Sequence, residues 1–229
     1  MATFASMSIK RAFAADAGTA AYYEMRAAEY DEWYMGKGRF ATRQRPGWDE
    51  EVELLVRFIA SLPAARTLDV ACGTGFLTRH LSGFTVGVDQ SRSMVTIAKS
   101  RQPGGLAVVG DALGVAVPDG SFDRLFTAHF YGHLPPDEQH RFLAEARRVA
   151  AELAVVDAAL RPGVAPEERQ ERVLNDGSRH TVYKRYLTAT QLAAELGGEP
   201  ILDGRWFVGA RVQWTDRDAP GRQRHRRIP

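Results

Sequence analysis

Short apolar runs alternate with helical patterns through the middle of the chain, and this alternation constrains the fold more than any other feature. Five runs have the composition of strands: RTLDV (66–70), FTVGVD (84–89), LAVVGD (106–111), FDRLFTA (122–128) and ELAVVD (152–157). Such alternation is typical of βαβ units and a mostly parallel sheet. Helices are expected to begin near Phe76, Ser91 and Pro136, with only a loop or short helix between the third and fourth runs.

Both ends of this region carry further signals. A helix is expected over residues 19–35 and another from about Asp49 to Pro63. After Asp157 the pattern gives way to a polar stretch, and a helix is expected again over 187–197. Residues 206–214 then alternate in period two after an Asp-Gly pair, which predicts an antiparallel hairpin at the sheet edge.

Length and charge limit the domain organisation. A chain of 229 residues fits one large α/β domain. We predict an N-terminal helical lid over 1–48, the main domain over 49–215 and a basic tail over 216–229. No apolar run approaches the roughly 20 residues that span a bilayer, and the first residues lack a signal-peptide core, so a cytoplasmic enzyme without membrane association is expected. A homodimer is compatible with the sequence.

Composition also argues against several classes of site. Cys72 is the single cysteine, which excludes a disulfide framework, and its place in a glycine turn favours a packing role over a nucleophilic one. No metal site is expected. The net charge of +2 is too small to predict nucleic-acid binding, and RQRHRR near the C-terminus is typical of a mobile end, with an RNA- or phosphate-binding arm as the alternative.

A glycine turn follows the first strand in TLDVACGTG. Gly73 and Gly75 alone do not distinguish flavin, nicotinamide and adenosyl cofactors, because all use close backbone approach at such a turn. Thr78 replaces the small third residue of the dinucleotide fingerprint. Asp69, inside the strand, would repel a pyrophosphate and attract an ammonium group. An amino-acid-bearing cofactor is therefore favoured.

Two further strands end in acids, Asp89 and Asp111. Ligands of open α/β sheets bind outside the carboxyl ends of the strands, so these carboxylates are expected to line one crevice. Asp89 suits the two hydroxyls of a ribose, and Asp111 suits the exocyclic amine of adenine, although Asp111 alone also fits a turn residue or helix cap. Together with Asp69 they describe adenosine joined to an amino acid.

At this point the chain resembles the class I S-adenosylmethionine-dependent methyltransferases, over about residues 50–214. LDVACGTG is similar to their motif I, VGVDQS to the motif of the second strand, GDAL to the adenine-contacting motif and FDRLFTAHFYGHL to that of the fourth strand. The resemblance implies a Rossmann-like, doubly wound sheet of seven mostly parallel strands in the order 3-2-1-4-5-7-6, and S-adenosylmethionine as cofactor with S-adenosylhomocysteine as product. It assigns the cofactor to Asp69, Ala71, Gly73, Gly75, Asp89, Gln90, Met94, Asp111, Ala112 and Ala128.

The segment YYEMRAAEYDEWY is similar to the opening helix of menaquinone and ubiquinone methyltransferases. By that resemblance Tyr22, Arg26 and Tyr30 form a lid over the cofactor, with Arg26 able to pair with its carboxylate. The alternative is an aromatic stripe that belongs to the core. A lid would seclude a small acceptor and obstruct a macromolecule.

Candidate substrate residues follow the fourth and fifth strands. His129 and His133 are candidates for a general base or for orienting the substrate, and Tyr131 lies between them, although His133 also fits a loop-to-helix junction. In residues 175–186, His180, Tyr183, Lys184 and Arg185 suit an anionic or phenolic substrate or a solvated surface, and 175–177 suggest a turn.

These features favour an enzyme that methylates carbon or oxygen of a phenol, a quinone or another natural-product scaffold. HFYGHL lacks the Asn-Pro-Pro-Tyr-type sequence of many amide- and base-N-methylating relatives. The alternatives are an RNA or protein methyltransferase that docks through the basic tail, a protein of this fold that does not transfer methyl, and a nicotinamide reductase.

Overall fold

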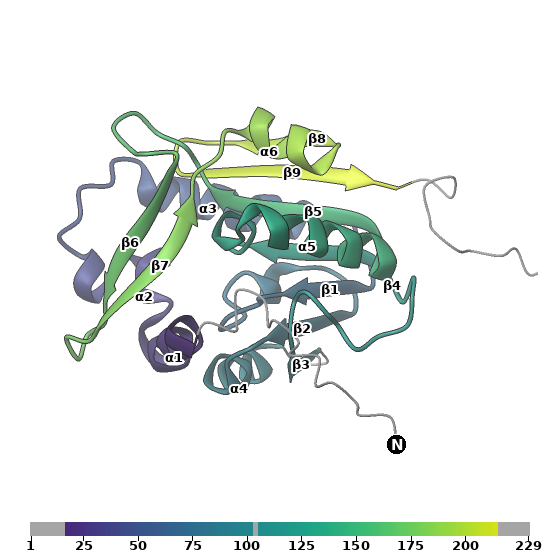
Figure 1. Cartoon of the computed structure of the whole chain (residues 1–229), viewed down its shortest axis with the longest axis horizontal. Helices are drawn as coiled ribbons and strands as arrows, with labels where there is room; N and C mark the ends of the chain where they lie inside the picture. The colour runs from purple at the N-terminus through teal and green to yellow at the C-terminus, as the bar shows by residue number, and fades with distance from the viewer. Residues whose placement is uncertain (1–16, 103–104, 215–229) are drawn as a thin grey trace, which may run out of the picture.

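The computed structural model describes residues 17–102 and 105–214 (Figure 1). Seven strands form one sheet in the order β3-β2-β1-β4-β5-β9-β8. Their bounds are Thr67–Val70 (β1), Thr85–Asp89 (β2), Leu106–Val109 (β3), Phe122–Ala128 (β4), Ala150–Ala158 (β5), Glu199–Asp203 (β8) and Phe207–Gln213 (β9). Strands β1 to β5 are parallel, and β9 is antiparallel to both neighbours. Because β6 and β7 lie outside this sheet, its own strands run 3-2-1-4-5-7-6, and the predicted order is confirmed.

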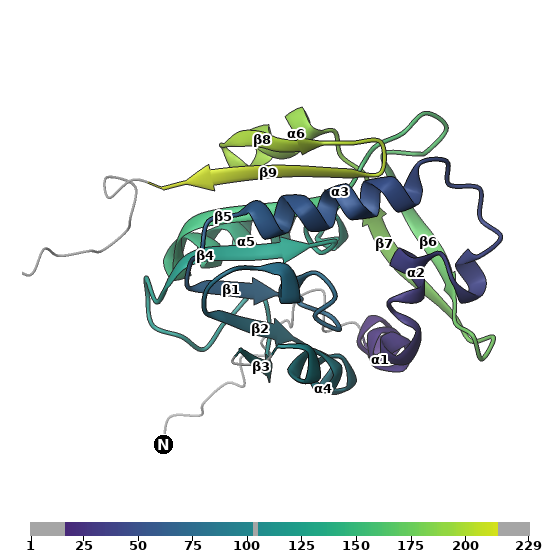
Figure 2. The same cartoon turned by 180° about the vertical axis from the view of Figure 1, so that it is seen from behind.

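Helices cover both faces of the sheet. Helix α5 (Pro136–Val149) buries Phe142 and Ala146 on one face, and α6 (Ala189–Leu196) extends the same core. On the other face, α3 (Trp48–Ser61) lies against β4 and β5, as Figure 2 shows from behind. Its Leu55 and Ile59 belong to the same buried cluster as Phe126 of β4 and Val156 of β5. Helix α4 (Arg92–Arg101) packs beside β2 and β3. The apolar spacing predicted α3, α4, α5 and α6 correctly.

Two helix predictions need correction. The helix expected near Phe76 is a single 3₁₀ turn, Thr78–His80, because few residues separate the glycine turn from β2 and α3 already covers this face. The helix expected over 19–35 is broken into α1 (Ala17–Arg26), a 3₁₀ turn (Ala27–Glu29) and α2 (Glu32–Met35). Gly36 ends α2 in a left-handed conformation.

The polar stretch after β5 is a two-stranded antiparallel sheet that was not predicted. Strands β6 (Glu167–Val173) and β7 (Arg179–Arg185) stand beyond the end of the main sheet beside α1 and α2 (Figure 1). The expected turn at 175–177 joins them. Tyr22 of α1 packs with Leu174 and Val182 of this hairpin. The described part of the predicted lid therefore rests on the hairpin as well as on the main sheet.

Two predictions fall on the ends of the chain. The first 16 residues of the predicted lid and the basic tail lie outside the described residues. Within the described ranges, no helix is long and apolar enough to cross a membrane. The same ranges hold no group of three or more His, Cys, Asp or Glu side chains placed to bind a metal ion.

Candidate active site

A cavity lies at the carboxyl edge of the sheet, where β1, β2, β3 and β4 end. Its empty volume is about 610 Å³, including the part that is open to solvent. Nine of the thirteen residues predicted to bind a cofactor line it: Tyr30, Ala71, Gly73, Asp89, Gln90, Met94, Asp111, Ala112 and Ala128. His129 and His133 line it too. The parallel arrangement of the strands and the position of the lid thus bring together residues as far apart in the chain as Tyr23 and His133.

Asp89, at the end of β2, connects two backbone segments at this edge of the sheet. Its Oδ2 accepts a hydrogen bond from the Gly73 N–H and its Oδ1 one from the Ser91 N–H, each at 2.9 Å. Burial raises the pKa of Asp89 to about 6, against the effect of these backbone donors. A carboxylate has about four acceptor sites, so Asp89 is not saturated by these donors and can accept from a ligand hydroxyl.

Two non-glycine residues of the described chain have positive φ, and both line this cavity. Ala71 (φ 55°) follows β1 and His129 (φ 57°) follows the neighbouring β4. A left-handed conformation costs an L-residue roughly 1–2 kcal/mol, and such strain gathers at functional sites. The His129 N–H donates to the Val156 carbonyl at 2.9 Å, which holds the strained turn against β5.

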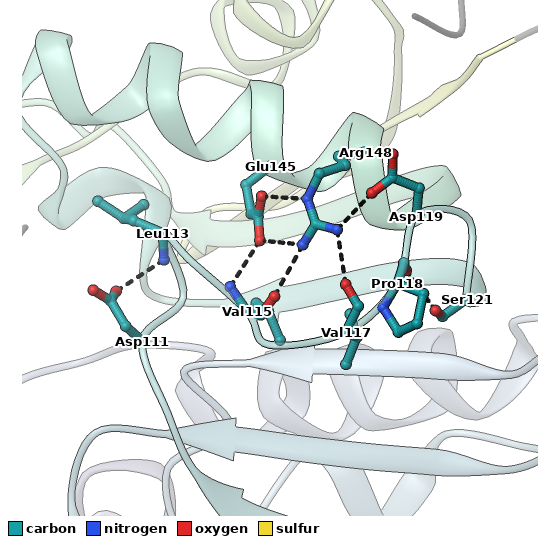
Figure 3. A network of polar contacts seen from close by, with 9 residues as sticks. All are labelled: Asp111, Leu113, Val115, Val117, Pro118, Asp119, Ser121, Glu145 and Arg148. Carbon is teal, nitrogen blue, oxygen red and sulfur yellow. Dashed lines mark hydrogen bonds and ion pairs between the residues drawn. The ribbon is translucent and has the colours of Figure 1, made fainter. Parts of the chain in front are cut away.

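The wall near β3 contains polar atoms suited to a nucleoside. Oε1 of Gln90 is buried without a hydrogen-bond partner among the described residues. Oδ1 of Asp111 accepts from the Leu113 N–H at 2.9 Å, so Asp111 is a turn residue and lines the cavity as well. Figure 3 shows how Arg148 of α5 fixes the following loop through Glu145 and the carbonyls of Val115 and Val117. The unpaired Gln90 oxygen beside Asp89 fits a ligand with several donors.

Asp69 does not present the negative charge that was predicted. It is fully enclosed, lines a separate small hollow beside Ala71 and accepts a 2.5 Å hydrogen bond from Thr78 Oγ1. Burial raises its pKa to about 8, so the carboxyl is largely neutral at pH 7. Burial of this strand residue, which its sequence position does not reveal, is the reason for the difference.

Gly75 lies outside the cavity and serves packing. Its φ is +73°, and a Cβ there would lie 3.2 Å from the Cα of Ala98 in α4. Cys72 also packs against the Val95 and Ala98 side of α4, in keeping with the predicted packing role, and burial raises its pKa.

Replacing Gly75 with alanine is expected to lower the free energy of unfolding by about 1–3 kcal/mol, from backbone strain plus the close contact with α4. Gly163→Ala is the matched control, because Gly163 has φ +79° with open space around it. Urea unfolding of both variants measures the difference. Equal losses would show that the contact with Ala98 contributes nothing.

The lid is bound to the main domain by contacts that sequence reasoning missed. Glu24 of α1 accepts from the hydroxyls of Ser91 and Ser93 at 2.6 and 2.5 Å, at the start of α4. Asp31 pairs with Arg101 at 2.6 Å and accepts from Thr74 Oγ1. Acidic residues interspersed among the lid aromatics were the available signal. These contacts hold Tyr30 above Gly73. A Cβ atom added to Gly73 would lie 3.4 Å from the Tyr30 ring, so the two are in close contact.

Tyr22 and Arg26 are in the lid but do not line this cavity. The Arg26 guanidinium lies over the rings of Tyr22 and Tyr30, at 5.5 and 5.0 Å from their centroids, and donates to the Tyr22 hydroxyl. Arg26 instead lines a second, larger hollow of about 1290 Å³ of empty space. The two hollows share Tyr23, Tyr30, His129 and His133.

Sequence reasoning missed most of the second hollow. Its aromatic lining comes from the lid, from α3, from the residue after β7 and from the turn between β8 and β9, in this order: Trp33, Trp48, Tyr186 and Trp206. Its basic lining includes Arg43, Arg45, Arg161, Arg172 and Lys184. The Arg-rich segment 39–45 and the alternation in 167–173 and 179–185 were the signals that could have indicated it.

The two histidines differ in their surroundings. Nε2 of His129 is buried without a partner among the described residues, and Trp33 and Phe207 pack on the ring at 4.9 and 5.5 Å. Burial lowers the pKa of His129 to about 4, so the imidazole is neutral at pH 7. Nδ1–H of His133 donates to the Tyr183 carbonyl at 2.6 Å, and burial lowers its pKa well below the usual range.

Four of the residues predicted to bind substrate do not reach either hollow. Tyr131 is buried beside Phe142, and His180 packs on Tyr22 with ring centroids 5.2 Å apart. Arg185 pairs with Glu195 of α6 at 2.7 Å. Tyr183 alternates with Lys184 and so takes the opposite face of β7. The register of the hairpin, which the sequence did not reveal, decides these positions.

The sheet order and the cavity at its carboxyl edge define the protein as a Rossmann-like α/β protein of the methyltransferase type. Residues 68–154 match the family described as a methyltransferase domain. Over these residues the chain is similar to the class I S-adenosylmethionine-dependent methyltransferases.

Similar proteins support this assignment. The chain is 38% identical over 118 residues to dTDP-3-amino-3,6-dideoxy-alpha-D-glucopyranose N,N-dimethyltransferase of Streptomyces fradiae, covering 50% of this chain and 42% of that one. It is 34% identical over 100 residues to demethylmenaquinone methyltransferase of Thermotoga maritima, covering 42% and 43%. The chain thus spans less than half the length of these two relatives. The solved DhpI-SAM-HEP complex shares the fold, with a TM-score of 0.67, 24% identity and coverage of 85% and 95%.

Proposed function

We propose that this protein transfers a methyl group from S-adenosylmethionine to carbon or oxygen of a small phenolic, quinone-like or other natural-product acceptor. The observation that carries the proposal is the cavity in which Asp89, with two backbone donors already in place, lies beside the unpaired oxygen of Gln90. That cavity meets the aromatic second hollow at His129.

Each part of the cavity has a proposed role. Asp89 accepts hydrogen bonds from the ribose hydroxyls, Gln90 and Met94 flank the adenine, and Asp111 with Ala112 contacts its edge. The backbone at Ala71 and Gly73 lies against the methionine portion. Bound S-adenosylmethionine supplies the methyl group from its sulfonium by in-line displacement. The chain supplies alignment and excludes water.

The second hollow is proposed to hold the acceptor. Trp33, Trp48 and Trp206 make part of the lining aromatic, which suits an acceptor with a ring system. Residues of the lid and of the β6–β7 hairpin line the hollow on two sides, which favours a small molecule over an RNA or protein acceptor. A quinone-like acceptor also accords with the name of the Thermotoga relative, demethylmenaquinone methyltransferase.

Asp89→Ala tests the cofactor site. The variant is expected to bind S-adenosylmethionine about 1–3 kcal/mol more weakly in isothermal titration calorimetry, because the ribose hydroxyls lose their acceptor. Since the pKa of Asp89 is about 6, wild-type affinity should also decline as the pH falls from 7 to 5, whereas Asp89→Asn should lack this decline.

The control is Asp123→Ala, which removes an exposed carboxylate paired with Arg66 near the opposite edge of the sheet. It should bind the cofactor as the wild type does. Unchanged affinity in a folded Asp89→Ala variant would refute the assigned site.

The acceptor can be found directly. The protein is incubated with a metabolite extract and S-adenosylmethionine labelled in its methyl group, and the labelled product is identified by mass spectrometry. Formation of S-adenosylhomocysteine together with a labelled small molecule supports the proposal. Label in RNA or protein instead would favour the macromolecular alternative.

A further inference from the structure

Positive charge gathers in the second hollow without matching negative charge. Arg26, Arg43, Arg45, Arg161 and Arg172 all line it. In the part of the chain that the structure describes, none of these five guanidinium groups forms an ion pair with a carboxylate. Lys184 also lines the hollow, but the buried carboxylate of Asp157 neutralises it. These five arginines are called the arginine cluster below.

The arginine cluster is brought together from four separate segments. Arg26 comes from α1, Arg43 and Arg45 from the loop before α3, Arg161 from the loop after β5, and Arg172 from β6. These residues repel one another: burial and then the charges of Arg172 and Arg26 lower the pKa of Arg43. Gathering like charges costs free energy, so a bound anion would relieve a cost that the folded chain otherwise carries.

Much of the cluster is withdrawn from water. Arg26 is 8% exposed, and Arg45, Arg161 and Arg172 are half-buried. Nη2 of Arg45 and Nε of Arg172 are buried and lack hydrogen-bond partners among the described residues. Unpaired donors of this kind distinguish the cluster from an ordinary solvated surface, because buried N–H groups normally have an acceptor.

Aromatic rings orient the guanidinium groups. Arg45 lies 3.7 Å from the ring centroid of Trp48, and Arg161 lies 4.3 Å from that of Trp206. Arg45 also donates through Nη1 to the Trp33 carbonyl at 2.9 Å, and Arg161 through Nη1 to the Ala159 carbonyl at 3.1 Å. A guanidinium has five N–H donors, so the remaining N–H groups of each can still bind an oxyanion. Glu168 lies on the same face of β6 as Arg172, and its Oε1 accepts hydrogen bonds from the Tyr186 hydroxyl and the Gln170 amide at 3.1 Å each.

We propose that the methyl acceptor carries a dianionic oxyanion group, a phosphate monoester or a phosphonate, which the arginine cluster binds while the reacting atom lies at His129. This inference rests on the proposed methyltransferase function and names the acceptor class for the same site. A tetrahedral dianion matches several forked donors that converge from different segments. A neutral acceptor would leave five positive charges uncompensated.

The test uses small probes of stated charge. Trp33, Trp48 and Trp206 line the hollow, so tryptophan fluorescence reports binding there. The full chain is titrated with glycerol 2-phosphate, methylphosphonate, acetate and glycerol, with and without S-adenosylhomocysteine. Both dianions are expected to bind at least roughly tenfold more tightly than acetate and to weaken as ionic strength rises, and glycerol should not bind. A comparison of glycerol 2-phosphate with methylphosphonate shows whether the site prefers a phosphate or a phosphonate.

Variants locate the binding. Arg172→Gln is expected to weaken dianion binding roughly 10- to 100-fold, as for loss of a charge-assisted hydrogen bond. Arg43→Gln, at an exposed position that is safe for folding, should weaken it severalfold. Arg169→Gln is the matched control, because Arg169 is exposed on the opposite face of the same strand. It should leave the affinity unchanged within about twofold.

The outcomes are separable from those of the cofactor test. Dianions that bind no more tightly than acetate, or equal effects of the Arg43, Arg172 and Arg169 variants, would overturn the proposed acceptor class. If calorimetry shows S-adenosylhomocysteine binding but the dianions fail, only this inference falls. If S-adenosylhomocysteine fails to bind while the dianions bind through the arginine cluster, the anion site stands and the methyltransferase proposal falls.

Discussion

Replacing Lys184 with methionine is expected to lower the free energy of unfolding by about 3–5 kcal/mol, because it leaves a buried carboxylate without its partner. Lys184 is 3% exposed and pairs with Asp157, which has no exposed surface. Asp157 also accepts from the Gly132 N–H at 2.7 Å. The pair therefore joins the hairpin, β5 and the loop that carries His133, and urea unfolding measures its contribution.

The pH dependence has a definite sign. Burial raises the pKa of Asp157, but Lys184 and the neighbouring histidines outweigh it and hold the pKa at about 2. Because this lies below the unfolded value of about 3.9, the contribution is present above about pH 4 and is lost as the pH falls through 2. The gap between wild type and Lys184→Met should narrow over that window.

Lys99→Met provides the control, because Lys99 is exposed on α4 and should change stability by less than about 0.5 kcal/mol. A Lys184→Met variant as stable as this control would mean that Asp157 is stabilised without its ion pair. The pair would then contribute nothing to holding the hairpin against β5.

Replacing His129 with asparagine is expected to lower kcat roughly 100- to 1000-fold for an acceptor that loses a proton on methylation. Methyl transfer makes the accepting oxygen strongly acidic, so even an imidazole with a pKa of about 4 can take its proton at Nε2. Asparagine tolerates the left-handed backbone at this position, so the turn is retained.

Three measurements separate this role from a structural one. The affinity for S-adenosylhomocysteine should be unchanged in His129→Asn, and so should the free energy of unfolding within about 1 kcal/mol. The part of the wild-type kcat that is lost in His129→Asn should be constant from pH 8 to 5. It should fall as the pH approaches 4, where His129 becomes protonated. An unaltered kcat would show that the chain supplies no proton acceptor at His129.

The two hollows differ in the charge of the groups that line them, and the proposed reaction assigns the cofactor to the first and the acceptor to the second. Acidic and amide oxygens gather in the first, and guanidinium groups and indole rings gather in the second. His129 borders both, and its strained backbone places it at the junction. A cationic cofactor and an anionic acceptor would thus each meet surroundings of complementary charge.

Local sequence patterns predicted much of the fold correctly. The five apolar runs became β1 to β5, and the period-two alternation over 206–214 became β9. Acids that close consecutive parallel strands must meet at one edge of the sheet, so strand order and residue position alone were enough to predict that Asp89 and Asp111 share one cavity. The helix near Phe76 failed because apolar spacing does not report that α3 already covers that face.

The second hollow could not be derived in the same way. Arg26, Arg45, Arg161 and Arg172 lie in four segments with no common pattern, and only the packing of the lid against the hairpin brings them together. The register of the hairpin also decided that Lys184 faces inward while Tyr183 and Arg185 face outward. A shift of one residue would have reversed both.

The sequence by itself determined the sheet and the edge at which the first cavity forms, because strand periodicity and the position of a residue at a strand end are local properties. Only the tertiary structure decided which side chains at that edge are charged at neutral pH. Burial makes Asp69 largely neutral and leaves His129 unprotonated, while the meeting of lid and hairpin concentrates the arginine cluster. Desolvation and long-range electrostatics depend on neighbours in space, and neighbours along the chain do not reveal them.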